Sequence, residues 1–286
     1  MSKTDRFSQE PPAVVQSSWV LPSGACDSHG HIFPARKLYP TDNETMPLSP
    51  IEFYLDVHAQ LGFERGVIVQ GGAYKFDNSA MLDALDQHRD SLRGVALLPA
   101  DTAETQLADY RSRNVRALRF TSGGASRIDN FPAIAPKLAN LGLHAEMYIG
   151  LTGFLDRATA LLGQVVPLVL DHLAGPFDSA IGTDDPGFQR LLALLRHEDI
   201  WIKLTPQRNS AQFPRYADVR PFQDALITAR PDRLVWGSDW PFPNMSEQTP
   251  DLGALVTLFG EWVTDDTLRQ SILVDNAAAL YGFSQK

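Results

Sequence analysis

The sequence is poor in cysteine and in long apolar runs. Cys26 is the only cysteine among 286 residues, so no disulfide can form within the chain, as is typical of proteins from reducing compartments. No run of about 18 apolar residues occurs, and no membrane-spanning helix is predicted. The first residues lack the apolar segment of a secretory signal. We therefore expect a cytoplasmic protein.

Basic residues are also scarce, with 25 Lys and Arg against 34 Asp and Glu and a formal net charge of -9. Nucleic acids and anionic membranes are bound through basic surfaces, so neither is an expected partner. Hydrophobic residues still make up 44% of the chain, which is enough for a large core. An anionic substrate would have to be bound by individual arginines, against the charge of the whole protein.

Short apolar runs alternate with amphipathic segments along the chain. Several runs are almost wholly apolar, as expected of parallel strands buried on both faces. The predicted strands are residues 25–31, 66–70, 94–98, 115–120, 143–149, 166–171, 200–204 and 233–237. Eight such units predict a single-domain TIM-type (β/α)8 barrel over residues 23–286, preceded by an extended lead-in, residues 1–22. An open doubly wound sheet is the alternative, but no Gly-x-Gly-x-x-Gly motif follows the first strand.

Several helix ends are marked by their residues. Ser49 and Pro50 predict a capped start, and Gly62 predicts the end of the same helix. Asp185 is a predicted N-cap of a later helix. Residues 265–283 are predicted to form one last helix that packs back on the barrel.

Reactive side chains are concentrated where the predicted strands end. The first strand ends in Asp27-Ser28-His29-Gly30-His31, and strand alternation predicts that Asp27, His29 and His31 share one face while Cys26 points away. Later strand ends carry Arg119, Tyr148, Asp171, His172, Arg208 and Asp239. Because a TIM barrel builds its active site at these ends, we expect these side chains to meet there.

The three histidines and Asp239 form the most informative set. A single His-x-His pair is a weak signal, but His29 and His31 joined to His172 and Asp239 indicate a catalytic or metal site. Arg119 and Arg208 would be ion-pair partners or, facing three histidines, anion-binding groups. Asp171 either orients His172 or faces the helix layer, and the sequence leaves both readings open.

Four segments together resemble the amidohydrolase superfamily. They are the Asp-x-His-x-His end of the first strand, Asp-His-Leu-Ala-Gly at 171–175, Trp-Gly-Ser-Asp-Trp-Pro at 236–241, and the closing residues 276–283. The resemblance covers the chain from Gly24 onward. It is strongest to the lactone-acting branch, which contains 2-pyrone-4,6-dicarboxylate lactonase, sulfomuconolactone hydrolase and galactarolactone isomerase.

This resemblance implies roles for particular residues. Asp239 would activate a water molecule, and His29, His31 and His172 would surround the lactone carbonyl. The substrate-binding residues would be Arg119, Arg127, Tyr148 and Arg208. Two departures, Gly71-Gly72 after the second strand and the spacing of Arg127 from Arg119, argue against a pyrone dicarboxylate as the substrate itself.

The expected cofactor is none. Metal-dependent members usually carry a lysine, glutamate or histidine where this chain has Arg119 and Tyr148, and a guanidinium cannot serve as a ligand. The alternative is one zinc ion held by His29, His31, His172 and Asp239.

These observations predict a metal-independent hydrolase that opens a carboxylate- or sulfonate-bearing lactone in carbohydrate or aromatic catabolism. The alternatives are a sugar-acid lactone isomerase using the same site, a zinc-dependent hydrolase or decarboxylase of the superfamily, and a non-catalytic binder of acidic sugars. The expected partner is a small anionic lactone. A homo-oligomer is compatible with the sequence, which does not fix the oligomeric state.

Overall fold

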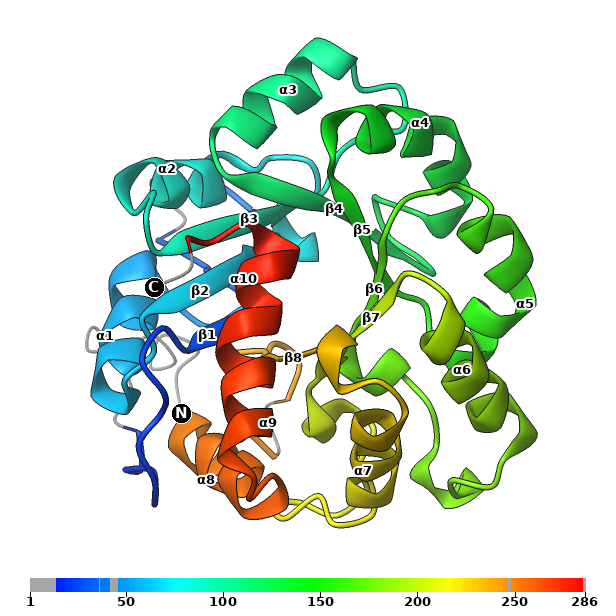
Figure 1. Ribbon diagram of the computed structural model, residues 1–286. Helices are drawn as coiled ribbons and strands as arrows, with labels where there is room; N and C mark the ends of the chain where they lie inside the picture. Colours follow the sequence, from blue (N-terminus) through cyan, green and yellow to red (C-terminus); the bar gives the residue numbers. More distant parts are fainter. Residues whose placement is uncertain (1–13, 36, 42–45, 246–247, 285–286) are drawn as a thin grey trace, which may run out of the picture.

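A computed structural model describes residues 14–35, 37–41, 46–245 and 248–284. Its centre is one sheet of eight parallel strands that pair in sequence order, surrounded by helices (Figure 1). The strands are β1 Cys26–Gly30, β2 Arg65–Val69, β3 Leu92–Ala96, β4 Val115–Thr121, β5 His144–Tyr148, β6 Leu168–Leu170, β7 Ile200–Leu204 and β8 Leu234–Trp236. The predicted TIM-type barrel in a single domain is confirmed, and every predicted strand is present.

The barrel closes between its first strand and the segment after its last. Gly30 and Trp240 form a parallel bridge, and the His31 amide donates to the Trp240 carbonyl at 2.7 Å. The Asp239 amide donates to the His29 carbonyl, also at 2.7 Å. The closure therefore places the two histidines of the first strand beside Asp239.

Helices fill the connections between strands. They are α1 Ile51–Leu61, α2 Ser79–Gln87, α3 Glu104–Ser112, α4 Phe131–Leu141, α5 Leu151–Leu162, α6 Pro186–His197, α7 Arg220–Ala229, α8 Leu252–Trp262, α9 Asp266–Gln270 and α10 Asn276–Tyr281. Gly62 ends α1 with a φ of 91°, and the Asp185 carboxylate accepts from the Phe188 amide, as predicted. The predicted Ser49 cap is wrong, because the Ser49 hydroxyl bonds to the Pro47 carbonyl and its backbone pairs with Phe33.

The expected face of the first strand is also wrong. The register of β1 against β2 shifts between Asp27 and Gly30. As a result, the Asp27 carboxylate bonds to His58 of α1 and to Ser238, whereas His29 faces the barrel interior. Cys26 is buried as predicted, but it lies inside the barrel rather than pointing away from it.

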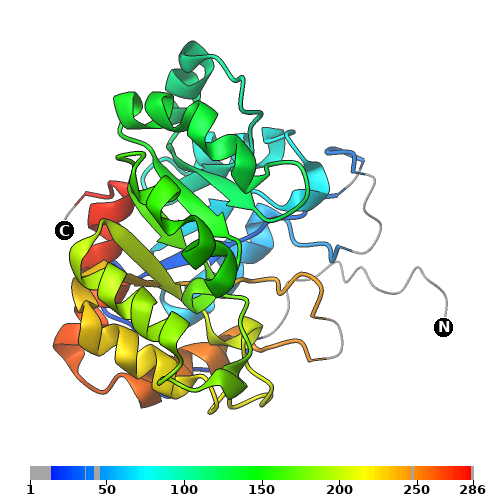
Figure 2. The ribbon, with the colours of Figure 1, turned by 90° about the vertical axis from the view of Figure 1, so that its right-hand side faces the viewer.

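The barrel interior is layered. At the amino ends of the strands, Val67, Val169 and Val235 pack with Cys26 into an apolar layer. Residues of α10 and of the segment just after it close this layer from below: Ala277, Ala278, Tyr281 and Phe283. Figure 2 shows α10 at this end of the barrel and the loops after β1 and β8 at the other. The predicted last helix is present as α9 and α10, joined through a π-helical turn, Ser271–Asp275.

The described part of the lead-in, residues 14–22, runs along α8. The Val15 amide donates to the Asp251 carboxylate at 3.1 Å, and the Trp19 indole donates to a backbone carbonyl of α8 at 2.8 Å. Gly260 allows this approach, because a Cβ there would lie 2.2 Å from the indole. Residues 1–13 lie outside the described residues. Within the described part of the chain, no helix has the length and hydrophobicity to cross a membrane.

Candidate active site

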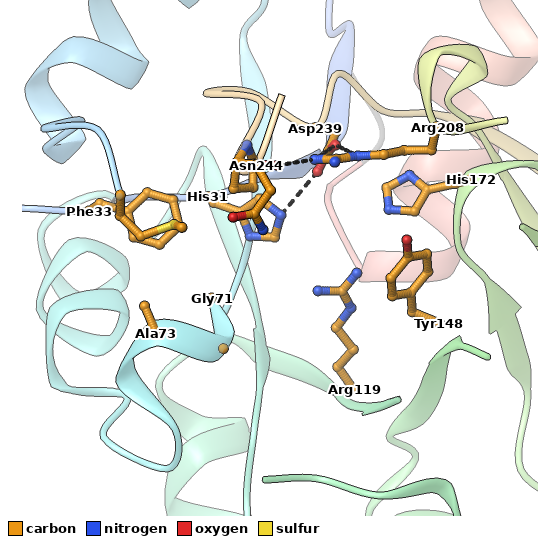
Figure 3. Close-up of a pocket in the computed structure, with 13 residues that line it drawn as sticks. His31, Phe33, Gly71, Ala73, Arg119, Tyr148, His172, Arg208, Asp239 and Asn244 are labelled. Atoms are coloured by element: carbon orange, nitrogen blue, oxygen red, sulfur yellow. Dashed lines mark hydrogen bonds and ion pairs between the residues drawn. The ribbon is translucent and has the colours of Figure 1, made fainter. Parts of the chain in front are cut away.

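A cavity of about 280 Å³ opens at the carboxyl ends of the strands (Figure 3). Its lining includes the predicted site residues His31, Arg119, Tyr148, His172, Arg208 and Asp239. The remaining lining residues are Phe33, Met46, Gly71, Gly72, Ala73, Pro243 and Asn244. Six of the eight predicted site residues therefore meet around one cavity, where a TIM barrel carries its active site.

Asp239 is the carboxylate that lines the cavity, and it is almost fully buried. Its Oδ1 accepts from His31 Nε2 at 3.1 Å, and its Oδ2 accepts from both Nε and Nη2 of Arg208. Burial alone would raise the pKa of Asp239, but the Arg208 guanidinium, His172 and His31 together outweigh burial and hold that pKa well below its usual range. The carboxylate is thus charged at neutral pH and covered by Arg208.

Two residues of the site have a left-handed backbone. Asp239 has a φ of 61° and His172 a φ of 53°, conformations that residues with a Cβ rarely adopt and that cost about 1–3 kcal/mol each. The Asp239 amide is fixed by the His29 carbonyl, and the His172 carbonyl accepts from Asn209 Nδ2 at 2.6 Å. These bonds aim both side chains at the cavity.

His31 lies between two acceptors. Its Nδ1 is 2.8 Å from the Val69 carbonyl and its Nε2 is 3.1 Å from Asp239 Oδ1. A carbonyl and a carboxylate both accept hydrogen bonds, so each ring nitrogen of His31 faces a group to which it can donate. His31 is therefore held between β2 and Asp239.

His172 follows β6 and presents its ring to the cavity beside Tyr148, with ring centroids 5.1 Å apart. Its Nδ1 has no hydrogen-bond partner among the described residues. Burial lowers the pKa of His172 to about 4. The ring is neutral at pH 7 and carries one N–H and one lone pair.

The low pKa of His172 predicts acid destabilisation. Between about pH 6.5 and pH 4, His172 binds a proton in the unfolded chain but not in the folded chain. The contribution of neutral His172 to the free energy of unfolding is therefore complete above pH 6.5 and falls by about 3 kcal/mol as the pH drops to 4. Urea unfolding of His172→Asn at pH 7.5 and 5 should show a weaker pH dependence than wild type, whereas His197→Asn, on the exposed end of α6, should not. Equal pH slopes for wild type and His172→Asn would contradict the assignment.

His29 lies beneath the cavity rather than in its lining. Its side chain is fully buried, with Nε2 3.7 Å from Asp239 Oδ1 and ring centroids about 5 Å from those of the other two site histidines. Burial, followed by the nearby Lys203 ammonium, lowers the pKa of His29 well below its usual value. The expectation that His29 touches the lactone carbonyl is therefore corrected, because His29 is fully buried and does not line the cavity.

Arg119 is held by Asp171. The guanidinium contacts Asp171 Oδ2 through Nε at 2.9 Å and Nη2 at 2.8 Å, and it lies over the Tyr148 ring. This two-point contact fixes the plane of the guanidinium at the cavity wall. Neither reading of Asp171 from the sequence is correct, since Asp171 orients Arg119 and not His172.

Arg127 does not reach the cavity. It precedes the short 3-10 helix Ile128–Asn130, is more than half exposed, and pairs with Asp129 at 3.3 Å. The loop after β4 turns back so that Arg127 pairs with Thr121 through the backbone, which carries the side chain away from the site. The expectation that it binds the substrate anion is corrected.

Sequence reasoning missed Lys203 and Glu146. Both side chains are fully buried inside the barrel, with Lys203 Nζ 2.5 Å from Glu146 Oε2. The available signal was a lone charge within each strand, since Lys203 interrupts the apolar run of β7 and Glu146 that of β5. A charge in a parallel strand buried on both faces requires an ionic partner inside the barrel.

The donor atoms are spaced for a metal ion, but the charges around them oppose one. One atom each of His29, His31 and Asp239 lies within 4.8 Å of the others, and His172 is adjacent, so these four residues would hold a zinc ion. However, the Asp239 carboxylate is already paired with Arg208, and the side chains of Arg119 and Lys203 bring two more positive charges to the same group of residues. The arrangement fits a metal-free site better than a dication site.

Comparisons with known proteins extend over nearly the whole chain. A family model described as Amidohydrolase matches residues 26–283. The chain is 34% identical to 4-sulfomuconolactone hydrolase of Rhizobium radiobacter over 276 residues, 93% of this chain and 92% of that protein. It is 33% identical to 2-pyrone-4,6-dicarboxylate hydrolase of Comamonas testosteroni over 289 residues, 91% of each chain. It is 28% identical to D-galactarolactone isomerase of Agrobacterium fabrum over 273 residues, 92% of this chain and 93% of that protein.

Proposed function

Because this chain belongs to the amidohydrolase family, we propose that it is a lactonase that opens an anionic lactone without a metal ion. The observation that carries the proposal is the position of Asp239, a charged carboxylate held between a histidine and an arginine at the edge of the cavity. A carboxylate in this position can take a proton from water, while the neighbouring donors stabilise the oxyanion that forms.

Substrate binding begins with the arginines. Arg119, fixed by Asp171, offers its remaining N–H groups to a carboxylate or sulfonate on the ring. Arg208 covers Asp239 in the free protein, and a substrate anion competes for its planar fork. When Arg208 turns to the substrate, Asp239 loses the charge that weakens it as a base. Binding and activation of the base are thereby coupled.

The chemical step uses one water molecule. Its oxygen attacks the lactone carbonyl carbon while Asp239 accepts one of its protons, and His172 and Tyr148 lie where they can donate to the carbonyl oxygen. Collapse of the tetrahedral intermediate breaks the ring C–O bond, and the proton on Asp239 passes to the departing oxygen. The product is the open-chain hydroxy acid.

The substrate class can be tested with a panel of aldonic, aldaric, muconic and pyrone lactones. Hydrolysis releases acid, so a pH indicator reports turnover directly. We expect acid release with at least one anionic lactone and none with its neutral methyl ester. Saturable binding without turnover across the panel would instead indicate a binder of acidic sugars.

Lactone isomerisation is the second candidate, because one relative of similar coverage is named a lactone isomerase. Asp239 would then deprotonate a hydroxyl of the substrate, which attacks the carbonyl from within the same molecule. No acid is released, so the pH indicator stays silent. Proton NMR separates the two candidates, since a ring-shifted lactone indicates isomerisation and an open acid indicates hydrolysis.

Metal independence has its own test. We expect protein purified without added metal to contain less than stoichiometric zinc, and its turnover to be unchanged by dialysis against a chelator. The reason is the surplus of cations around Asp239, which opposes a dication. Loss of activity on chelation with recovery on adding zinc would establish the zinc-dependent alternative, with His29, His31, His172 and Asp239 as the ligands.

A further inference from the structure

A cluster of buried charges lies directly beneath the cavity. Lys203 Nζ is 2.5 Å from Glu146 Oε2, 3.1 Å from His29 Nδ1 and 3.4 Å from Asp171 Oδ1. All four side chains are fully buried. The proposed reaction uses none of these contacts directly. Burying such a cluster costs free energy, which indicates a role beyond packing.

The hydrogen bonds of Lys203 decide which nitrogen of His29 carries a proton. An ammonium only donates, so a hydrogen bond from Lys203 requires a lone pair on His29 Nδ1. Asp171 Oδ1 also lies 3.3 Å from Nδ1 and would require a proton there instead. However, the Lys203 contact is the shorter of the two, at 3.1 Å, and has hydrogen-bond geometry, whereas the contact with Asp171 is an ion-pair distance of 3.3 Å.

We infer that Lys203 is a positioning residue that fixes neutral His29 with its proton on Nε2, the nitrogen that faces Asp239. His29 Nε2 has no other partner among the described residues and lies 3.7 Å from Asp239 Oδ1. The opposite tautomer would place a lone pair against a carboxylate oxygen, which repels it. With the proton on Nε2, His29 attracts Asp239 from below.

The consequence for catalysis rests on the function proposed above. When a substrate anion draws Arg208 away, Asp239 keeps two N–H neighbours, His31 and His29, which hold it in line for the water. An Nε2 that carries a proton is also not free to coordinate a metal ion. Lys203 therefore acts on the reaction through His29, without touching the substrate.

Glu146 provides the counter-charge for Lys203. Its second oxygen, Oε1, accepts from the Tyr281 hydroxyl at 2.8 Å, and its first neutralises Lys203. Lys203 and Glu146 form an ion pair with no net charge. Replacing both by neutral side chains of similar size removes the donor to His29 without leaving an unpaired ion behind.

The tautomer can be read directly by NMR of protein labelled with ¹⁵N-histidine, with His29 assigned by loss of its signals in His29→Asn. Long-range ¹H–¹⁵N correlations distinguish a proton on Nε2 from one on Nδ1. We expect the Nε2–H form of His29 in the wild-type protein, and an Nδ1–H form would overturn the inference. This readout needs no substrate, so it stands even if the lactone panel shows no turnover.

The double variant Lys203→Met, Glu146→Gln tests the link to catalysis. We expect His29 to move its proton to Nδ1, toward Asp171, and kcat to fall about 10- to 100-fold with KM nearly unchanged, as is usual for residues that orient a catalytic group. Lys137→Met, at a lysine that donates to the Thr102 carbonyl far from the site, is the matched control. A folded double variant with wild-type kcat and an unchanged His29 tautomer would refute the positioning role of Lys203. If the double variant does not fold, the His29 tautomer in the wild-type spectrum tests the inference by itself.

Discussion

Asp239→Asn is expected to lower kcat by at least about two orders of magnitude while the substrate still binds. The amide cannot accept a proton from water, and general-base catalysis is worth about 10²–10⁴-fold. Asparagine keeps the shape of the side chain and one oxygen that can still accept from His31 or Arg208. KM should change little, because the base contributes to the transition state more than to binding.

The measurement is steady-state kinetics on the best lactone of the panel, with binding of the substrate to the inactive variant followed by calorimetry. Asp129→Asn is the matched control, since Asp129 is an exposed carboxylate outside the cavity. Full activity in Asp239→Asn would show that another group activates the water.

Arg208→Met is expected to raise KM by roughly 10- to 100-fold. Methionine keeps much of the apolar stem but removes the planar fork, and each charge-assisted hydrogen bond to an anion contributes about 1.5–3 kcal/mol. Arg127→Met removes the same fork from a residue that the structure places outside the cavity, and its KM should match that of the wild type. A large effect at Arg127 with none at Arg208 would show that the anion binds elsewhere.

The Arg208→Met variant can also be tested through the pH dependence of its kcat/KM. The guanidinium of Arg208 is the main influence that holds the pKa of Asp239 down against burial, so removing it raises that pKa. A general base with a higher pKa becomes protonated at higher pH. The acid limb of kcat/KM, which reports the free enzyme, should therefore move toward neutral pH in Arg208→Met. A profile that coincides with the wild type would mean that Asp239 is not the group that titrates.

The fold and the location of the site could be predicted from the sequence because both depend on local patterns. Apolar runs mark strands buried on both faces, and the rule that barrel active sites lie at the carboxyl ends of strands selects the residues that follow them. Asp239, His31, His172 and Arg119 were found in this way, although they are far apart in the sequence. The alternation rule failed on the first strand, where a register shift turned Asp27 toward α1.

The pairing of charges could not be predicted. Lys203 and Glu146 are 57 positions apart, and only the closed barrel shows that each is the partner of the other. Likewise, strand alternation did not reveal that Arg208 covers Asp239 or that His29 lies beneath the cavity. These arrangements depend on ångström-scale distances between strands, whereas periodicity in the sequence fixes only which face a side chain occupies.

The apolar layer at the amino ends of the strands also limits when the protein can finish folding during synthesis. Cys26 lies on the first strand, yet the apolar layer around it is closed by Ala277 and Tyr281 near the end of the chain. The hydroxyl of Tyr281 also completes the partners of Glu146 beneath the cavity. A ribosome must therefore make almost the entire chain before this apolar layer can be closed, so the layer stays open to water until synthesis is nearly complete.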